Sequence, residues 1–269
     1  MSIATSRASA PARAGLAVSL SGVARAFDER VVLRGIDLEI APGESIALLG
    51  ASGCGKATLL RQVSGLDRPS EGRIEIDSSP VRGIDLRCSV GFQEPRLLPW
   101  RTIEHNVTLG LPHGIDKRLG RERVSELLQL VGLAESRGLR PRQVSGGMAQ
   151  RASLARALAR KPGVLVLDEP FGALDALTRL QMQDLLLDVH AAEPTTILLV
   201  THDVDEALYL ADRVVLIGTD PEAPRNSGAG IRSIIEVPGV RPRDRGDATL
   251  AHLRAELLGG LGVHTHHHG

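Results

Sequence analysis

One glycine-rich stretch, Gly50–Thr58, restricts the possible folds of this chain more than any other feature. It follows the apolar run Ser45–Leu49 and precedes a segment with a helical pattern, Thr58–Val63. A strand, a glycine loop and a helix in this order are the context of a phosphate-binding loop. The glycines let successive backbone N–H groups point inward, and the helix adds the positive end of its dipole. Lys56 supplies a full charge that suits terminal phosphates.

The loop departs from the phosphate-binding pattern G-x-x-x-x-G-K-[ST] at its last position. Ala57 stands where a hydroxyl would ligate magnesium. Thr58 has a hydroxyl, but it is rotated by about 100° along the helix, so we do not expect it to reach the same site. A chance glycine turn before a helix is the alternative interpretation, and the flanking strand and helix weigh against it.

The amino-acid composition argues against several classes of function. The 269 residues suit one α/β domain with an insert. Only 2% are aromatic and the formal net charge is +0, which argues against a nucleic-acid platform. The two cysteines, Cys54 and Cys88, lie in the loop and near a predicted strand, so we expect no disulfide and a reducing cytoplasm. No run approaches the roughly 20 apolar residues of a membrane span, so any membrane role requires a partner.

The chain divides into a core, an insert and two tails. Short alternating runs between Leu16 and Leu49 predict strands, with a hairpin turn at Asp28–Arg30. Phe27, beside this turn, is either a core residue or a stacking partner for a purine ring. Prolines and one amphipathic helix predict a helical insert at about 94–159. We expect a disordered tail at 1–14 and a solvated His-rich tail at 263–269, with metal binding as the weaker alternative.

The motifs further along the chain are predicted to lie at the ends of helices and strands. Ser145 can cap a helix, and Gly146 and Gly147 keep its first turn open to a ligand. The apolar run before Asp168 and Glu169 predicts a buried parallel strand, and carboxylates at such an end lie where ligands bind in open α/β sheets.

A second buried strand, Thr196–Val200, ends in Thr201, His202 and Asp203. A lone histidine after a strand is more often structural than functional. Asp203 with Glu206 makes a plausible capping pair for the next short helix.

The order of these motifs resembles the nucleotide-binding subunit of ATP-binding cassette (ABC) transporters, over roughly 16–217. The resemblance implies an α/β fold, a P-loop NTPase of ABC type with an antiparallel β subdomain and a helical insert. It implies one ABC ATPase domain at 15–262, with ATP and Mg²⁺ as cofactors.

By resemblance, Glu169 is the general base and His202 the switch histidine. Asp168 holds the magnesium ion through water, and Gln93 touches magnesium or the attacking water. Lys56, His202 and the loop amides neutralise phosphate charge, in keeping with a reaction that depends on positioning and electrostatics. Ser145, Gly146 and Gly147 resemble the signature motif, which meets the γ-phosphate held by another subunit. Val144 and Met148 depart from the commonest signature but flank its phosphate-facing atoms. The expected nucleotide-binding residues are Phe27, Gly50, Ala51, Ser52, Gly53, Cys54, Gly55, Lys56, Ala57, Thr58, Ser145, Gly146 and Gly147.

The stretches 93–100 and 167–179 are similar to importers for nitrate, taurine and aliphatic sulfonates, and sulfonate is favoured by similarity alone. The implied partners are a second copy of the chain, two transmembrane permease subunits and, indirectly, a periplasmic solute-binding protein, without nucleic acid. The implied location is the cytoplasmic face of the bacterial inner membrane. In this group Leu97–Trp100 would receive the permease's coupling helix.

Two other functions remain open. Ala57 favours a cassette that binds nucleotide and dimerises but hardly hydrolyses it, whereas intact Glu169 and His202 favour an ATPase. A soluble cassette of DNA repair or translation usually carries two cassettes in one chain or a coiled-coil insert, and neither is found here.

Overall fold

The computed structural model describes residues 15–220 and 227–262, so both predicted tails lie outside the described residues. Ten strands in this part form one mixed sheet in the order β5-β4-β1-β2-β10-β9-β3-β8-β7-β6. The strands are β1 (Val18–Phe27), β2 (Arg30–Ile40), β3 (Ser45–Leu49), β4 (Glu71–Ile76), β5 (Ser79–Pro80), β6 (Cys88–Gly91), β7 (Val164–Asp168), β8 (Thr196–Val200), β9 (Arg213–Gly218) and β10 (Ser227–Glu236).

The sheet has a parallel and an antiparallel part. Strands β6, β7, β8, β3 and β9 are parallel, as the continuous apolar runs predict. Strands β1, β2, β4 and β5 are antiparallel, and β1 joins β2 through the hairpin predicted at Asp28–Arg30. Strand β10 links the two parts because it pairs in parallel with β2 and antiparallel with β9. The α/β fold with an antiparallel β subdomain is therefore confirmed.

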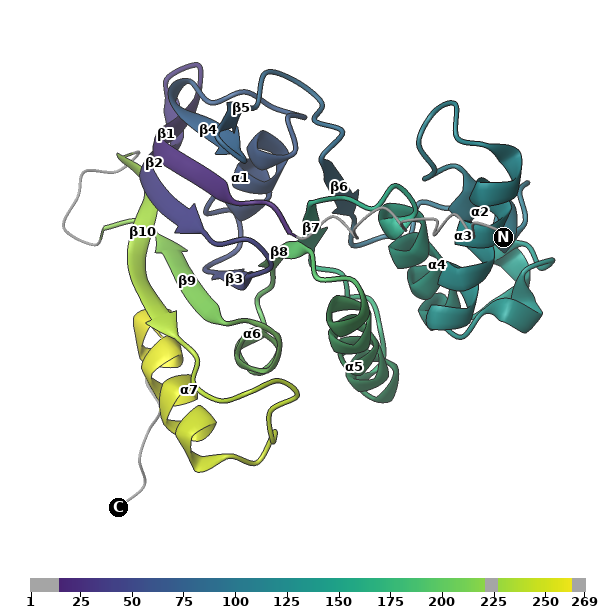
Figure 1. The fold of residues 1–269 in the computed structure, drawn as a ribbon. Helices are drawn as coiled ribbons and strands as arrows, with labels where there is room; N and C mark the ends of the chain where they lie inside the picture. Colours follow the sequence, from purple (N-terminus) through teal and green to yellow (C-terminus); the bar gives the residue numbers. More distant parts are fainter. Residues whose placement is uncertain (1–14, 221–226, 263–269) are drawn as a thin grey trace, which may run out of the picture.

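Helices cover both faces of the parallel strands (Figure 1). Alternate residues of β7 point to opposite faces: Val164 and Val166 pack in one core with α1 (Lys56–Val63), and Leu165 and Leu167 pack in another with α5 (Ala176–Ala192). Helices α6 (Val204–Leu210) and α7 (Ala248–Gly260) complete the fold against β3 and β9.

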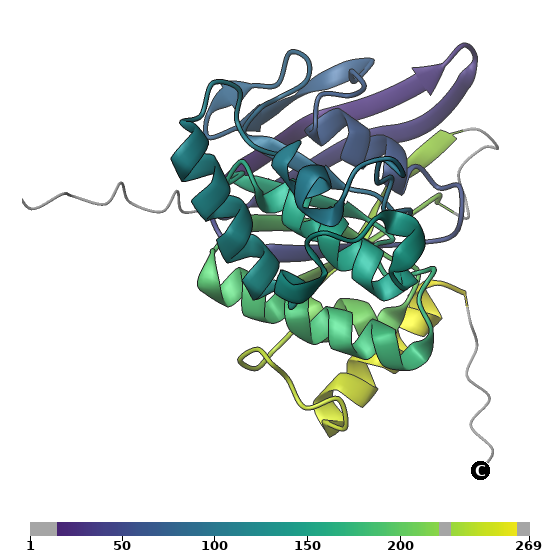
Figure 2. The same cartoon turned by 90° about the vertical axis from the view of Figure 1, so that its right-hand side faces the viewer.

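A helical lobe stands beside the β6–β7 end of the sheet (Figures 1 and 2). It contains α2 (Ile103–Thr108), α3 (Lys117–Leu130) and α4 (Gly146–Leu158), with short 3-10 turns at Ala134–Ser136 and Pro141–Gln143. Asp116 caps α3, and the predicted apolar face of that helix lies in the core of the lobe. No helix in the described ranges is long and apolar enough to cross a bilayer. Cys54 and Cys88 are free, as predicted.

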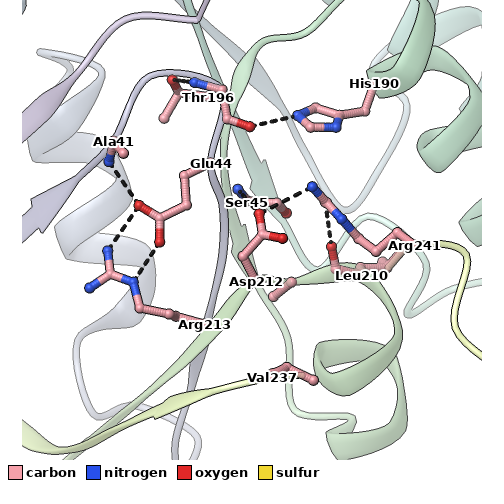
Figure 3. Close-up of polar contacts among 12 residues, drawn as sticks. Ala41, Glu44, Ser45, His190, Thr196, Leu210, Asp212, Arg213, Val237 and Arg241 are labelled. Atoms are coloured by element: carbon pink, nitrogen blue, oxygen red, sulfur yellow. Dashed lines mark hydrogen bonds and ion pairs between the residues drawn. The ribbon is translucent and has the colours of Figure 1, made fainter. Parts of the chain in front are cut away.

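Ion pairs fix the ends of the parallel strands that lie opposite the glycine loop (Figure 3). Glu44, just before β3, accepts the Ala41 N–H at 2.7 Å and pairs with Arg213 at the start of β9. Asp212 accepts the Ser45 N–H at 2.9 Å and lies 3.1 Å from the Arg241 guanidinium. These contacts hold β3 in register, and β3 delivers the chain to the glycine loop.

The prediction that Glu206 forms a capping pair with Asp203 is wrong for the glutamate. Asp203 does cap α6 by accepting from the N–H groups of Asp205 and Glu206. The Glu206 side chain instead lies in the interior, 3% exposed, with Gln183 of α5 within hydrogen-bond distance. Tertiary packing of α6 on α5 therefore overrides the local capping pattern.

Stability should depend on the charge of this buried carboxylate. Burial raises the pKa of Glu206 from 4.5 to about 7, so folding disfavours its ionised form. The protonated side chain favours the folded state, and this contribution to the free energy of unfolding is lost as pH rises from about 4.5 to about 7. We expect Glu206→Gln to stabilise the fold at pH 8 by up to about 3 kcal/mol, with the gain shrinking toward pH 5. Denaturant unfolding of both proteins at the two pH values measures this, and equal gains at both would contradict it.

Candidate active site

The glycine loop adopts the conformation that its composition predicts. Gly53 and Gly55 have positive φ angles of 77° and 102°, and Gly55 is the N-cap of α1. A Cβ on Gly50 would lie 2.2 Å from the Ile217 carbonyl oxygen. Since that neighbour is backbone, Gly50 has no room for a side chain, and the loop lies close against the end of β9.

Lys56 begins α1 and is 6% exposed. Its Nζ atom donates to the carbonyl oxygens of Gly50 at 2.7 Å and Ala51 at 2.9 Å, and lies 3.9 Å from the Cys54 sulfur. The ammonium is therefore held inside the curve of the loop by its own backbone.

The loop forms one wall of a cavity of about 690 Å³. Strand ends and the β1–β2 hairpin supply the other walls. Its lining residues are Phe27, Arg30, Val32, Ser52, Gly53, Gly55, Lys56, Ala57, Thr58, Gln93, Asp168, Glu169 and Val200. Residues far apart in the sequence and predicted as site residues thus meet here.

Sequence reasoning missed three of the lining residues, Arg30, Val32 and Val200. Arg30 is the last residue of the predicted hairpin turn, which begins directly after Phe27, and this position was the only available signal. Phe27 is 47% exposed, and the Arg25 guanidinium lies 4.0 Å from the centroid of its ring. Phe27 is therefore a cavity residue and not a core residue.

Two carboxylates follow each other at the C-terminal end of β7. Asp168 is the last residue of the strand, and burial, then the neighbouring charge of Glu169, raises its pKa against the opposing effect of Arg61, Lys56 and Arg96. Glu169 has a φ of 45°, in the left-handed region that costs a non-glycine residue energy. Its N–H donates to the Val200 carbonyl oxygen at 2.9 Å, which ties the turn to β8.

Glu169 lies beside the two other predicted polar residues of this edge. Its Oε2 atom lies 3.3 Å from Nδ1 of His202. A Cβ on Gly172 would lie 3.4 Å from Gln93 Nε2 and 3.7 Å from Glu169 Oε2. Gln93 and Glu169 therefore both lie beside Gly172, on the same side of the turn.

The Ser145-Gly146-Gly147 motif is not brought into this cavity. Ser145 is exposed and caps α4, accepting the Met148 N–H at 3.2 Å, as predicted. A Cβ on Gly147 would lie 2.5 Å from the Thr178 methyl group, so the motif packs against the first turn of α5. None of its three residues lines the cavity.

Only part of the predicted apolar loop Leu97–Trp100 is exposed. Leu97 and Leu98 are half-buried, and Leu97 packs on the core of the lobe. Trp100 is 66% exposed and, with Pro99, borders a hollow of about 620 Å³ that also contains Arg140, Arg142 and Gln143.

Helix α4 holds the chain on both sides of Gln93. Gln150 Nε2 donates to the Phe92 carbonyl oxygen at 3.2 Å, and Arg156 donates to the carbonyl oxygens of Pro95 and Arg96 at 2.7 and 2.9 Å. The helix that begins after Ser145 is thereby hydrogen-bonded to the chain between Phe92 and Arg96, which leads from Gln93 to the Trp100 loop.

Comparison with known proteins agrees with this geometry. The family model described as ABC transporter matches residues 33–172. An aliphatic sulfonates import ATP-binding protein of Granulibacter bethesdensis is 49% identical, covering 91% of this chain and 94% of the relative. Another, of Xanthomonas axonopodis pv. citri, is 45% identical, covering 92% and 96%.

A solved dimeric ATP-binding cassette in a post-hydrolysis state, bound to ADP and Pi, shares 28% identity, with a TM-score of 0.67 and coverage of 83% of this chain and 100% of that one. Fold, motif order and relatives agree, and the chain belongs to the ABC transporter family as an ABC-type ATPase cassette.

Proposed function

We propose that this chain is the ATP-hydrolysing subunit of an ABC importer for small anions, with aliphatic sulfonates as the solute. The observation that carries the ATPase function is the assembly of Lys56, Asp168, Glu169 and Gln93 around one cavity, with His202 in contact with Glu169. The choice of sulfonate over taurine or nitrate is supported by the names of the relatives alone.

Each residue has a proposed role in phosphoryl transfer. Lys56 and the loop amides bind the β- and γ-phosphates, and Phe27 stacks on the adenine. Glu169 orients and deprotonates the attacking water, and His202, in contact with Glu169, stabilises the charge on the γ-phosphate. We further propose that 15–262 form one ATPase domain with its insert at about 94–159.

Asp168 and Gln93 fit a magnesium ion bound together with the nucleotide. Oxygen donors suit this cation. Burial, and then the charge of Glu169, raises the pKa of Asp168, and a cation would favour its ionised form. No cluster of three or more His, Cys, Asp or Glu ligands is found at 15–220 and 227–262, so the phosphates must supply much of the coordination. When bound, the ion would neutralise charge that develops on the phosphates.

The complete site requires a second copy of the chain. Ser145, Gly146 and Gly147 lie outside the cavity, although the exposed start of α4 offers N–H groups suited to a phosphate. We propose that two copies pair head to tail, so that the Ser145 motif of one completes the cavity of the other.

Magnesium-dependent ATP hydrolysis by the purified full chain tests the enzymatic part of this function. The specific rate should rise with protein concentration, because two copies build each site. Absence of hydrolysis with ATP still bound would favour the alternative function, a binding and dimerising cassette impaired by Ala57.

Two permease subunits and a periplasmic solute-binding protein are proposed partners at the inner membrane. The Trp100 hollow is the proposed permease contact, since exposed Trp and Arg side chains are typical of residues that dominate binding energy. Its connection to Gln93 through α4 would carry the contact to the cavity.

Trp100→Ala should lower solute transport at least about tenfold while changing the basal ATPase rate of the isolated chain less than about threefold. Transport and ATPase assays of the same variant measure both effects. Leu119→Ala is the matched control, because Leu119 is 49% exposed in the same lobe but does not border the hollow. An equal loss of both activities in Trp100→Ala would show that the tryptophan has a structural role.

A further inference from the structure

The side chain of His202 has little packing of its own. It is 66% exposed, and its Nδ1 atom lies 3.3 Å from Glu169 Oε2. A side chain in this setting takes its position from the backbone that carries it. The geometry of residues 201–203 therefore determines where the imidazole lies relative to Glu169.

Thr201 closes a short turn around His202. Its backbone N–H donates to the Leu48 carbonyl oxygen of β3 at 3.3 Å, and its side chain is buried. The Thr201 Oγ1 atom accepts the Asp203 N–H at 3.0 Å, a bond that spans His202. This bond needs the hydroxyl oxygen to face Asp203, and hence the hydroxyl hydrogen to point elsewhere.

Glu206 interacts with the Thr201 side chain and can accept that hydrogen. Its carboxyl group is 3% exposed and accepts from the Gln183 amide at 3.4 Å. The charged groups that face it are Asp203 of the same turn and Arg179 of α5. An ionisable group is costly to bury, and the phosphate cavity does not include it.

Asp203 anchors the other side of the turn. Beyond capping α6, its carboxylate lies 3.5 Å from the Arg179 guanidinium, which also donates to the Leu174 carbonyl oxygen at 3.2 Å. His202 thus lies between two residues that are both tied to buried or half-buried partners.

We propose that Thr201 and Glu206 are positioning residues for His202. The buried carboxylate orients the Thr201 hydroxyl, and the oriented oxygen holds the Asp203 N–H and with it the backbone at His202. This inference rests on the proposed ATPase function, because His202 is one of the residues proposed to act in ATP hydrolysis.

The test compares Thr201→Val, which keeps the shape and removes the hydroxyl, with Thr201→Ser, which keeps the hydroxyl. In magnesium-dependent ATP hydrolysis by the full chain, we expect Thr201→Val to lower kcat about tenfold with KM for ATP changed less than twofold. Thr201→Ser should recover most of the rate. Equal rates in the two variants, or a loss confined to KM, would overturn the proposal.

A double-mutant cycle separates positioning from general damage. If Thr201 acts through His202, Thr201→Val should lower the rate much less in a His202→Ala background than in the parent. Full additivity would overturn the proposal. Absence of ATP hydrolysis by the parent chain would instead refute the proposed ATPase function. Failure of the positioning proposal and failure of the ATPase function are therefore distinguishable.

Glu206 provides an independent pair of variants. Glu206→Gln keeps an acceptor for the Thr201 hydroxyl, whereas Glu206→Met has similar length and none. Glu206→Met should have a kcat several-fold lower than that of Glu206→Gln. Its melting temperature should not fall below that of the parent, because the substitution removes a buried carboxylate. Equal kcat values in Met and Gln would overturn the role of the carboxylate.

Discussion

Glu169→Gln is expected to abolish steady-state ATP hydrolysis, by a factor of about 10² to 10⁴, while leaving ATP binding intact. The amide is nearly isosteric with the carboxylate but cannot accept a proton from the attacking water. Lys56 and the loop amides, the proposed phosphate-binding groups, are unchanged. A coupled phosphate-release assay and a nucleotide-binding titration on the same protein measure the two effects.

The same variant should form a stable dimer when ATP is added. The Ser145 motif lies outside the cavity of its own chain, so ATP that is not hydrolysed can bridge two copies. Light scattering measures the mass with and without ATP. Adding Lys56→Ala to the variant is the control, and it should remain a monomer because the phosphate-binding charge is lost. A persistent monomer of Glu169→Gln at high protein concentration with bound ATP would contradict head-to-tail pairing.

Ala57→Ser is expected to raise the ATPase rate about tenfold and to move its magnesium dependence to lower concentration. Ala57 lines the cavity at the first turn of α1, where phosphate-loop enzymes place a hydroxyl on the metal ion. Water can fill that ligand position, but with weaker metal affinity and a looser γ-phosphate. A small misplacement of this kind lowers rate strongly. Rate against magnesium concentration at saturating ATP measures both effects.

Ala57→Cys is the matched control for size. Its thiol takes the place of the serine hydroxyl and is larger, so it fills at least the same space. Magnesium prefers oxygen ligands, so cysteine should not reproduce the gain. If Ala57→Ser has the parent rate and the parent magnesium curve, the missing hydroxyl does not limit this site.

Thr58 also lines the cavity, which makes it a second possible source of the hydroxyl. We expect Thr58→Val to leave the magnesium curve unchanged, because position 58 is rotated by about 100° from position 57. A shift to higher magnesium concentration would show that Thr58 replaces the absent serine and that the rotation argument is wrong.

The sequence predicted the site best where local pattern and chemistry coincide. The glycines, Lys56 and the carboxylates after β7 follow from strand, loop and helix order, and the structure brings them to one cavity. Val32 and Val200 were missed because their place on the cavity wall depends on how β2 and β8 lie beside the loop, which no local pattern records.

For Glu206, a local sequence pattern gave a wrong prediction. Its spacing from Asp203 fits a helix cap, yet α6 packs on α5 and turns this side chain inward toward Gln183. Capping patterns describe one helix, whereas burial depends on the neighbour against which the helix packs. Packing also determines how much of the Leu97–Trp100 loop is exposed, since Leu97 packs on the core of the lobe.

The most direct test of whether this chain drives sulfonate import is the uptake of a labelled alkanesulfonate by cells from which the gene for the chain has been deleted. We expect uptake to be lost, to be restored by the parent chain and not to be restored by Glu169→Gln, while uptake of nitrate and taurine is unaffected by the deletion. Undiminished sulfonate uptake in the deleted cells, or full restoration by Glu169→Gln, would contradict an importer driven by ATP hydrolysis at this site.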